Sequence, residues 1–150
     1  MIHTIFIAEK SLGEQLQVDK INLITGKGIV GDRNFNKAKW PGQNITFIEM
    51  EEIEAFNNNY QQRIQLADTR RNVITQGIRL NDLVGKEFLI GDVRFKGVEL
   101  CEPCAILGKL LSNDTLTKKE VVKAFTHKSG LRADVLSDGE IQSGMTFKVT

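Results

Sequence analysis

The feature that most constrains the fold is a series of short apolar segments, most of them closed by glycine or asparagine. Segments of this length are typical of β-strands, and glycine and asparagine favour the turns that join strands. The predicted strands cover residues 5–7, 18–24, 44–48, 72–75, 87–90, 93–100 and 146–149. The pattern therefore predicts a mainly β protein.

The clearest turn is Gly91-Asp92, which stands between two of these apolar segments. A two-residue turn containing glycine predicts a β-hairpin there. Along the second arm of the hairpin, the alternation of apolar side chains shifts by one position at Gly97. This shift predicts a β-bulge or a bend at that glycine.

Apolar residues recur at helical spacing in three segments, residues 49–56, 104–111 and 116–125. Pro103 is placed for the first turn of the second helix, and Thr117 with Glu120 would form a capping box on the third. Many short strands with a few helices predict an α+β fold, a bent sheet or barrel. No linker or repeat divides the chain, so we expect a single domain over residues 1–150.

The 150 residues are 41% hydrophobic and 26% charged, with a net charge of +1. This near-neutral balance argues against nucleic acid or a membrane surface as the main partner, because such proteins are usually basic. The apolar start reaches Glu9 and Lys10 too early for a signal peptide, and no apolar run could span a bilayer. We therefore expect a cytoplasmic protein with reduced thiols.

Cys101-Glu-Pro-Cys104 is the densest chemical motif. A thiol at the start of a helix meets unpaired N–H groups that favour the thiolate, and Cys104 fits this position. A thioredoxin-like dithiol would need a βαβ context, which the surrounding pattern lacks. A zinc site would need about four ligands, and only His3 and His127 remain, so no zinc is expected. Burial of both cysteines as small hydrophobic residues stays open.

Arg70 and Asn72 form a second candidate site. In a strand, residues two apart lie on one face, so both side chains would point the same way. An arginine beside an amide suits a phosphate or a planar heterocycle. An Arg-Arg pair such as Arg70-Arg71 is, however, more often a solvated or salt-bridged edge.

The segment from Gly26 to Arg33 has the G-x-G-x-x-G spacing of dinucleotide-binding loops. Such a loop must open a helix, whereas residues 32–36 are typical of a loop. We therefore interpret the segment as a glycine-dependent turn. Lys10-Ser11, after the first predicted strand, could meet an anion, although an exposed pair of this kind usually has no role.

Taken in order, the motifs of this chain resemble the MOSC domain, the family named after the C-terminal part of molybdenum-cofactor sulfurases. The matching stretches are Lys10-Ser11, Gly28-Ile-Val-Gly31-Asp-Arg33, Arg70-Arg-Asn72-Val-Ile-Thr75, Leu80-Asn-Asp-Leu83-Val-Gly85, Ile90-Gly-Asp-Val93, Pro103-Cys104 and Gly130-Leu-Arg-Ala133-Asp-Val135-Leu. They run over almost the whole chain. The resemblance is to the short, stand-alone bacterial type. It implies that the domain is a bent β-barrel and that the protein binds no pyridoxal phosphate. Asn34 departs from the His or Tyr of many relatives.

The resemblance also implies roles for five residues. Cys104 corresponds to the cysteine that ligates molybdenum in related amidoxime-reducing enzymes. Arg70 and Asn72 correspond to residues that help hold the pterin of the molybdenum cofactor, and Lys10 and Ser11 match less closely. A soft thiolate suits such a metal centre or a persulfide. Cys101 is an additional thiol that could act as a resolving partner.

Four functions are consistent with these features. The first is a molybdenum-cofactor oxidoreductase that reduces N-hydroxylated compounds with electrons from a redox partner protein. The second is a sulfur carrier or transferase with a persulfide on Cys104 and no bound metal. The third is a non-catalytic module that binds the cofactor or an anion. The fourth is a thiol redox protein that uses Cys101 and Cys104. The sequence leaves the substrate and the oligomeric state open.

Overall fold

The computed structural model describes all residues from 1 to 150. Three α-helices and two short 3-10 helices accompany eleven strands. The helices are α1 (Met50–Tyr60), α2 (Ala105–Leu111) and α3 (Lys118–Phe125), and the 3-10 helices are η1 (Leu66–Thr69) and η2 (Leu80–Leu83). The strands are β1 (Ile2–Ile7), β2 (Leu16–Val18), β3 (Lys20–Ile24), β4 (Gly28–Ile29), β5 (Ile45–Glu49), β6 (Val73–Thr75), β7 (Glu87–Ile90), β8 (Val93–Leu100), β9 (Leu131–Val135), β10 (Gly139–Gln142) and β11 (Phe147–Val149).

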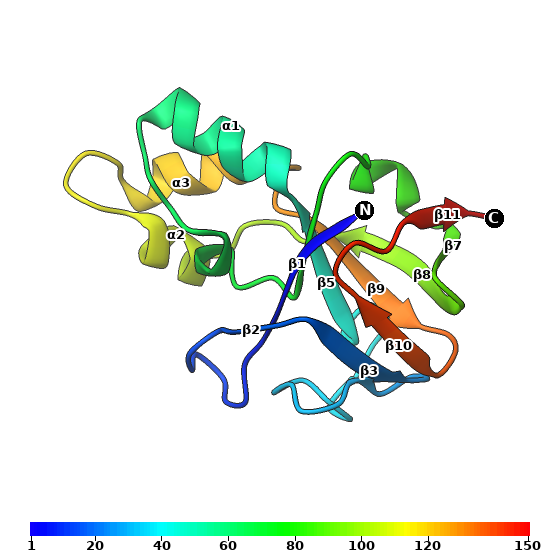
Figure 1. Ribbon diagram of the computed structural model, residues 1–150. Helices are drawn as coiled ribbons and strands as arrows, with labels where there is room; N and C mark the ends of the chain where they lie inside the picture. The colour runs from blue at the N-terminus through cyan, green and yellow to red at the C-terminus, as the bar shows by residue number, and fades with distance from the viewer.

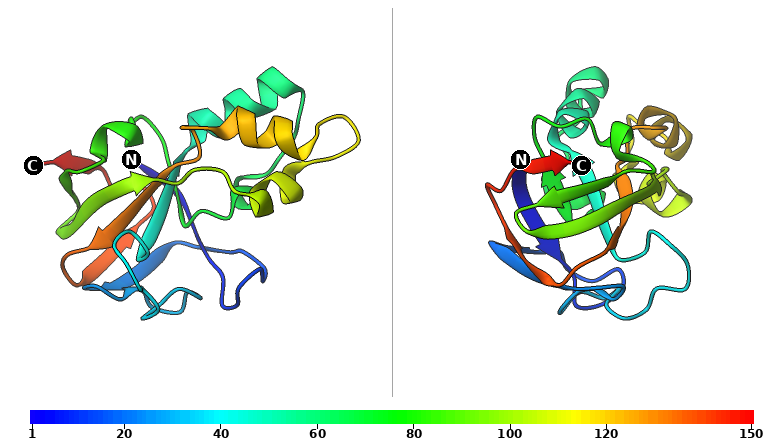
Figure 2. Two further views of the ribbon diagram at one scale, coloured as in Figure 1. Left: turned by 180° about the vertical axis from the view of Figure 1, so that it is seen from behind. Right: turned by 90° about the vertical axis from the view of Figure 1, so that its right-hand side faces the viewer.

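Eight strands form one curled sheet in the order β11-β7-β8-β9-β5-β6-β1-β2, and β10-β3-β4 form a second. All strand pairs are antiparallel except β5–β6, which α1 connects in a β-α-β crossover. The sheet curls into a half-barrel, and the three helices gather at one end of it (Figures 1 and 2). This α+β half-barrel confirms the predicted fold class.

The central strands are buried on both faces. Ile5, Phe47 and Val73 point into the barrel, where they meet side chains of the second sheet. Their neighbours Ile48 and Ile74 point the other way, against the helices. Two-sided burial explains why β1, β5 and β6 are almost continuously apolar instead of alternating with polar residues.

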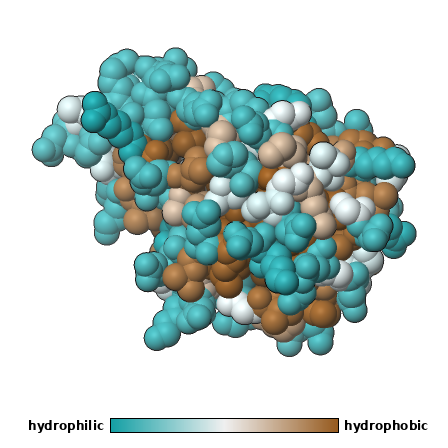
Figure 3. All heavy atoms as spheres, viewed as in Figure 1, coloured by the Kyte–Doolittle hydropathy of each residue, from teal (hydrophilic) through white to brown (hydrophobic).

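The helices cover the outer face of the sheet with one apolar stripe each. Ile53 and Phe56 of α1, Leu107 and Leu111 of α2, and Val121 and Phe125 of α3 share one cluster. Hydrophilic residues cover the outer side of this helical layer, and hydrophobic residues reach the surface along its junction with the sheet (Figure 3). Cys101 and Cys104 lie in the short segment that joins the end of β8 to the start of α2 in this layer.

Several local predictions are confirmed. The Gly91-Asp92 turn joins β7 and β8, whose residues Ile90 and Val93 pair. The register of β8 against β9 shifts after Gly97, and a Cβ there would collide with the carbonyl oxygen of Leu83. The capping box on α3 is present, with the backbone N–H of Glu120 donating to the Thr117 hydroxyl.

Other boundaries differ from the prediction. The predicted strand 18–24 is two strands, β2 and β3, which break at Asp19 and belong to different sheets. Helix α1 continues through the asparagine run to Tyr60, and the Asn57 side chain hydrogen-bonds the backbone of Ile64 in the following loop. Strands β4, β9 and β10 were not predicted. None of the three helices is long and apolar enough to cross a membrane.

Candidate functional site

One pocket contains the predicted thiol together with three arginines. It has a volume of about 220 Å³ and lies between the β1–β2 loop, the end of η1 and the first turns of α2. Its lining residues are Ser11, Leu12, Arg33, Thr69, Arg70, Arg71, Cys104, Ile106, Leu107 and Leu110. We call this the arginine pocket.

Cys104 is the exposed thiol of this pocket. Helix α2 begins one residue later, at Ala105, so Cys104 is the N-cap and has an extended backbone. The prediction that Cys104 opens the helix and that Pro103 lies in its first turn is therefore wrong by one to two residues. As an N-cap residue Cys104 remains at the helix start, and its side chain makes no capping hydrogen bond.

Arg70 enters the pocket from the end of η1. Its backbone is left-handed, with φ 59°, and closes the 3-10 helix. Its Nη2 donates to the carbonyl oxygen of Gly13, 2.9 Å away, which ties the guanidinium to the β1–β2 loop. Burial, and then the positive charge of Arg33, lowers the pKa of the Arg70 guanidinium. The pocket thus holds two like charges close together.

Arg33 and Arg71 were not predicted as site residues. Arg71 donates from Nε to the carbonyl oxygen of Ser129, and neither Arg70 nor Arg71 forms an ion pair. Arg33 lies 3.7 Å from the carboxylate of Asp32, which the backbone N–H groups of Ala8 and Asn34 hold in place. The only sequence signal for Arg33 was the Gly-Asp-Arg run.

No carboxylate lines the arginine pocket, and Asp32 beside Arg33 is the one negative charge next to it. Nη1 of Arg33 is buried and lies 3.7 Å from Oδ1 of Asp32, which balances its charge but is too far away for a hydrogen bond, so this donor remains available to an acceptor. Asp32 is the only carboxylate paired with any of the three arginines. These contacts define a site for an anion with several acceptor oxygens, next to a free thiol.

Cys101 is fully buried and does not line the arginine pocket. Its backbone carbonyl accepts a hydrogen bond from the Ser129 hydroxyl. Burial raises the pKa of the Cys101 thiol, and the charges of Arg71 and Arg132 offset this only in part. A buried, protonated thiol is a poor nucleophile, which argues against Cys101 as a resolving partner.

Asn72 does not share the pocket with Arg70. Strand β6 begins at Val73, after the left-handed Arg70, so the argument that placed both side chains on one strand face is wrong. The Asn72 side chain is buried, accepts from the Thr46 N–H and hydroxyl, and donates to the carbonyl of Phe6. Asn72 thus bridges β1 and β5, and it also lines a small polar pocket of about 100 Å³.

Ser11 and Lys10 are also separated. Ser11 lines the arginine pocket with Cys104. Lys10 lines a different pocket of about 140 Å³, formed with Glu9, Gly13, Glu14 and Leu16. Of the five predicted site residues, the structure brings together Cys104, Arg70 and Ser11.

The fold and pocket define an α+β half-barrel domain with an anion site beside a cysteine. The sequence profile of the MOSC domain matches residues 32–148, and the chain belongs to the MOSC domain family. This family is associated with molybdenum cofactor binding.

Three crystal structures share the fold. The YUAD protein from Bacillus subtilis is 18% identical, with a TM-score of 0.84 over 99% of this chain and 93% of that one. YiiM from Geobacillus stearothermophilus is 16% identical, with a TM-score of 0.77 over 100% of this chain and 74% of that one. YiiM from Escherichia coli is 15% identical, with a TM-score of 0.70 over 100% and 70%. A comparison with curated protein sequences gives no significant match.

Proposed function

We propose that the arginine pocket binds the phosphate-bearing pterin of the molybdenum cofactor, with Cys104 as the molybdenum ligand. The observation that carries the proposal is the combination of three guanidinium groups and one exposed thiol in a single pocket. Arginine forks match the geometry of phosphate oxygens. A cysteine thiolate is a soft ligand for a high-valent metal.

The residues of this chain fit the cofactor in two respects. Nη1 of Arg33 makes no hydrogen bond, and Arg70 and Arg71 form no ion pair, so a phosphate would find donors on all three. No three His, Cys, Asp or Glu side chains cluster as a metal site, so a metal on Cys104 would bring further ligands from the bound group. Ser11 adds a hydroxyl group to the lining of the arginine pocket. We assign Asn72 a structural role, because its side chain holds together the strands that support the pocket.

The activity we propose is reduction of N-hydroxylated compounds. Such a reduction converts N–OH to N–H with two electrons and two protons and releases water. The bound cofactor would supply the redox chemistry, with electrons from a redox partner protein. The chain itself would bind the phosphate through its arginines, fix the metal through Cys104, and leave the open side of the pocket for the substrate.

The test is molybdenum content, measured by elemental analysis on protein purified from a host that makes the cofactor. We expect near-stoichiometric molybdenum in the wild type and loss of the metal in Cys104→Ser. Arg70→Ala should also lower the metal content, because it removes a phosphate donor. Cys101→Ser is the matched control and should retain molybdenum. Equal metal content in all four proteins would contradict the proposal.

A persulfide carrier is the second candidate, and the exposure of Cys104 favours it. An exposed thiol at a helix start can attack the outer sulfur of a persulfide on a donor protein, which forms the new S–S bond on Cys104 and releases the donor cysteine as a thiolate. If the wild type contains no molybdenum, the mass of Cys104-containing peptides decides between the functions. Added sulfur on Cys104 would support the carrier, and an unmodified thiol would leave an anion-binding module.

A further inference from the structure

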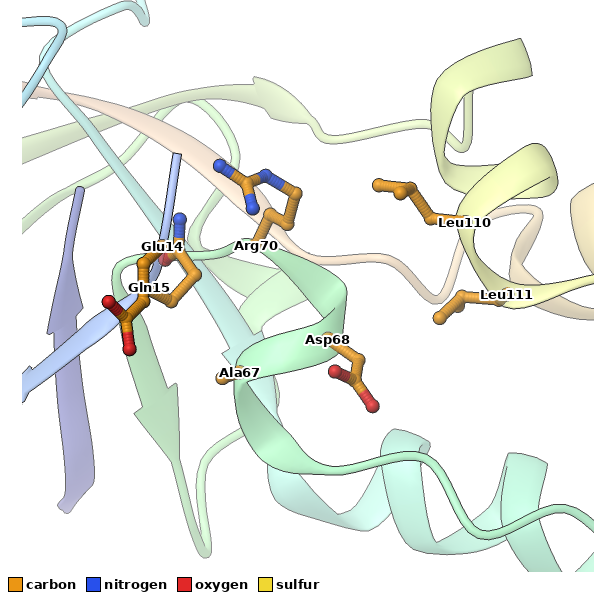
Figure 4. A pocket seen from close by; sticks show the side chains of 7 residues that line it. All are labelled: Glu14, Gln15, Ala67, Asp68, Arg70, Leu110 and Leu111. Carbon is orange, nitrogen blue, oxygen red and sulfur yellow. The ribbon is translucent and has the colours of Figure 1, made fainter. Parts of the chain in front are cut away.

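The thiol and the arginines of the arginine pocket lie on two different walls. Cys104 and Leu110 belong to the wall formed by α2 and its start, whereas Arg70 and Arg71 belong to the segment that follows η1. Figure 4 shows part of both walls, where Leu110 extends towards Arg70 across a neighbouring pocket of about 310 Å³. A ligand that contacts both the thiol and the arginines therefore needs the two walls at a fixed separation.

Packing fixes the body of α2 but not the chain that leads into it. Leu107 and Leu111 hold the helix in the apolar cluster of the helical layer. The preceding residues 101–104 have no regular secondary structure. Within them, Pro103 has no N–H group to donate, and the Cys104 side chain makes no capping hydrogen bond. The contacts that place the thiol before the helix begins must therefore come from residues 101 and 102.

The Glu102 side chain fastens this segment to the loop after α3. Its Oε1 accepts the backbone N–H of His127, 2.9 Å away, and its Oε2 lies 3.1 Å from Nδ1 of the same residue. Two contacts from one carboxylate to one residue restrict both the position and the direction of the side chain. The backbone N–H of Cys101 donates to the carbonyl oxygen of Gly130, 2.8 Å away. Two neighbouring residues of the segment thus bind the same loop.

The same loop, residues 127–130, also holds an arginine of the opposite wall. The carbonyl oxygen of Ser129 accepts a hydrogen bond from Nε of Arg71, 2.9 Å away. The loop is itself fixed, because the carbonyl oxygen of His127 accepts from Nδ2 of Asn81 at 3.0 Å and Ser129 is buried. We call residues 127–130 the bridge loop, since it contacts both the segment that carries the thiol and an arginine.

Stability does not account for the contact between Glu102 and His127. Their side chains are 46% and 72% exposed, and exposed ion pairs contribute little to the free energy of unfolding. Neither residue lines the arginine pocket, so neither contacts a ligand there. The effect of the contact is to turn the carboxylate towards the bridge loop and to order the last residues before Cys104. Order of this kind beside a binding site is preorganisation.

We propose that Glu102 is a positioning residue that holds Cys104 at the separation from the arginines which an anionic ligand needs to reach both. The inference rests on the proposed function, in which this ligand is the cofactor. Glu102 acts through the bridge loop, which fixes the chain before Cys104 on one side and Arg71 on the other. The negative charge of Glu102 itself opposes anion binding. Its effect through position and its effect through charge therefore have opposite signs.

The experiment alkylates Cys104 with two reagents of similar size, the anion iodoacetate and the neutral iodoacetamide. In both reactions the thiolate forms a C–S bond and iodide leaves, so the ratio of the two rates cancels the exposure and the ionised fraction of the thiol. The ratio reports how well the arginines hold the carboxylate of iodoacetate beside the sulfur. Tandem mass spectrometry of the full-length protein measures both rates. We expect a higher ratio in the folded wild type than in the urea-unfolded chain.

Glu102→Ala should lower this ratio by about two- to fivefold, the range of one partly exposed ion pair, whereas loss of its charge alone would raise the ratio. Glu102→Gln keeps a side-chain oxygen for the N–H of His127 and should retain most of the ratio. Glu99→Ala is the matched control, because this exposed carboxylate pairs with Arg132 and not with the bridge loop. It should leave the ratio unchanged or raise it. An unchanged or raised ratio in Glu102→Ala, or equal ratios in the folded and unfolded wild type, would overturn the proposal.

The result is separable from the test of the proposed function. Alkylation is measured on protein from a host that lacks the cofactor, and molybdenum content is measured without alkylation. An unchanged ratio in Glu102→Ala, together with molybdenum in the wild type, would overturn the positioning role alone. A lowered ratio, together with a wild type that binds no molybdenum, would contradict the cofactor and keep the positioning role for another anion.

Discussion

The barrel interior and the arginine pocket differ in how completely the polar groups and apolar side chains find partners. Inside the barrel, Phe47 is fully buried and lies 5.9 Å from the rings of Phe88, Phe95 and Phe147. In the arginine pocket, Leu110 is half exposed, Nη1 of Arg33 makes no hydrogen bond, and three arginines line one cavity. The barrel interior is fully packed, whereas the arginine pocket keeps hydrogen-bond donors and apolar surface that a ligand can contact.

This difference separates stability from binding. A well-packed aromatic core contributes to the free energy of unfolding and has nothing left to offer a ligand. Unpaired charges and exposed leucines lower or barely affect stability, yet they supply affinity when a complementary molecule arrives. Substitutions in the barrel interior should therefore change the free energy of unfolding strongly, whereas substitutions in the pocket should mainly change ligand affinity.

The largest effect is expected in the barrel. Phe47→Ala should lower the free energy of unfolding by about 3–5 kcal/mol, because it leaves a cavity among three aromatic rings. Equilibrium urea denaturation measures this change. Leu110→Ala in the arginine pocket is the matched control and should change the free energy of unfolding by less than about 0.5 kcal/mol. A similar loss of unfolding free energy in both variants would contradict the difference between the barrel interior and the pocket.

The two cysteines give the next effect. Cys104 should react with iodoacetamide at least about 100-fold faster than Cys101, which becomes accessible only when the structure opens locally. The raised pKa of the Cys101 thiol adds to its protection. Peptide mass spectrometry at successive times measures both rates, and Cys104→Ser should remove the fast reaction. Fast labelling of Cys101 in that variant would show that the structure around this buried thiol opens readily.

Anion binding should show a smaller change. Arg70→Ala should weaken binding of inorganic pyrophosphate by about tenfold, the loss of one charged hydrogen-bond donor in a partly exposed site. Calorimetry at low ionic strength measures the affinity, because salt screens exposed charges. Lys10→Ala removes a nearby positive charge that does not line the arginine pocket. If Lys10→Ala weakened pyrophosphate binding as much as Arg70→Ala, the long-range effect of positive charge would account for both changes in affinity.

The smallest effect concerns the charged side chain at the end of β5. Burial raises the pKa of the Glu49 carboxyl, and Arg79 and the N–H of Leu80 offset this in part. Because the folded protein then holds this proton more tightly than the unfolded chain, stability should fall as pH rises through the ordinary and then the raised pKa. Urea midpoints between about pH 4 and pH 7 test the sign. Glu49→Gln should reduce the slope, and Glu54→Gln on the exposed face of α1 should leave it unchanged.

The sequence predicted those parts of the fold that depend on local chemistry. The Gly91-Asp92 turn, the bulge at Gly97 and the capping box at Thr117 all follow from a few adjacent residues. The split at Asp19 could not be predicted, because the two halves of that segment pair with different sheets. Strand β9 was also missed, since its central position becomes visible only when β5 and β8 lie on either side of it.

The candidate site shows the same limit. Cys104 and Arg70 stood out as chemical motifs, and the structure brings them into one pocket. Arg33 and Arg71 join them only because the loop after β4 and the end of η1 meet in space. Asn72 looked like a partner of Arg70 on a strand, but a single left-handed residue, Arg70 itself, turns the chain before β6 begins.

The position of β1 within the sheet has a consequence for how the chain folds as it is synthesised. Ile5 pairs on one side with Val18, which follows soon after, and on the other side with Val73, far along the chain. The first strand therefore keeps an open edge until β6 has emerged, and pairings between distant segments form slowly. During that interval the apolar segment 2–7 is exposed to other strands, so we expect slow translation between residues 8 and 72 to increase aggregation.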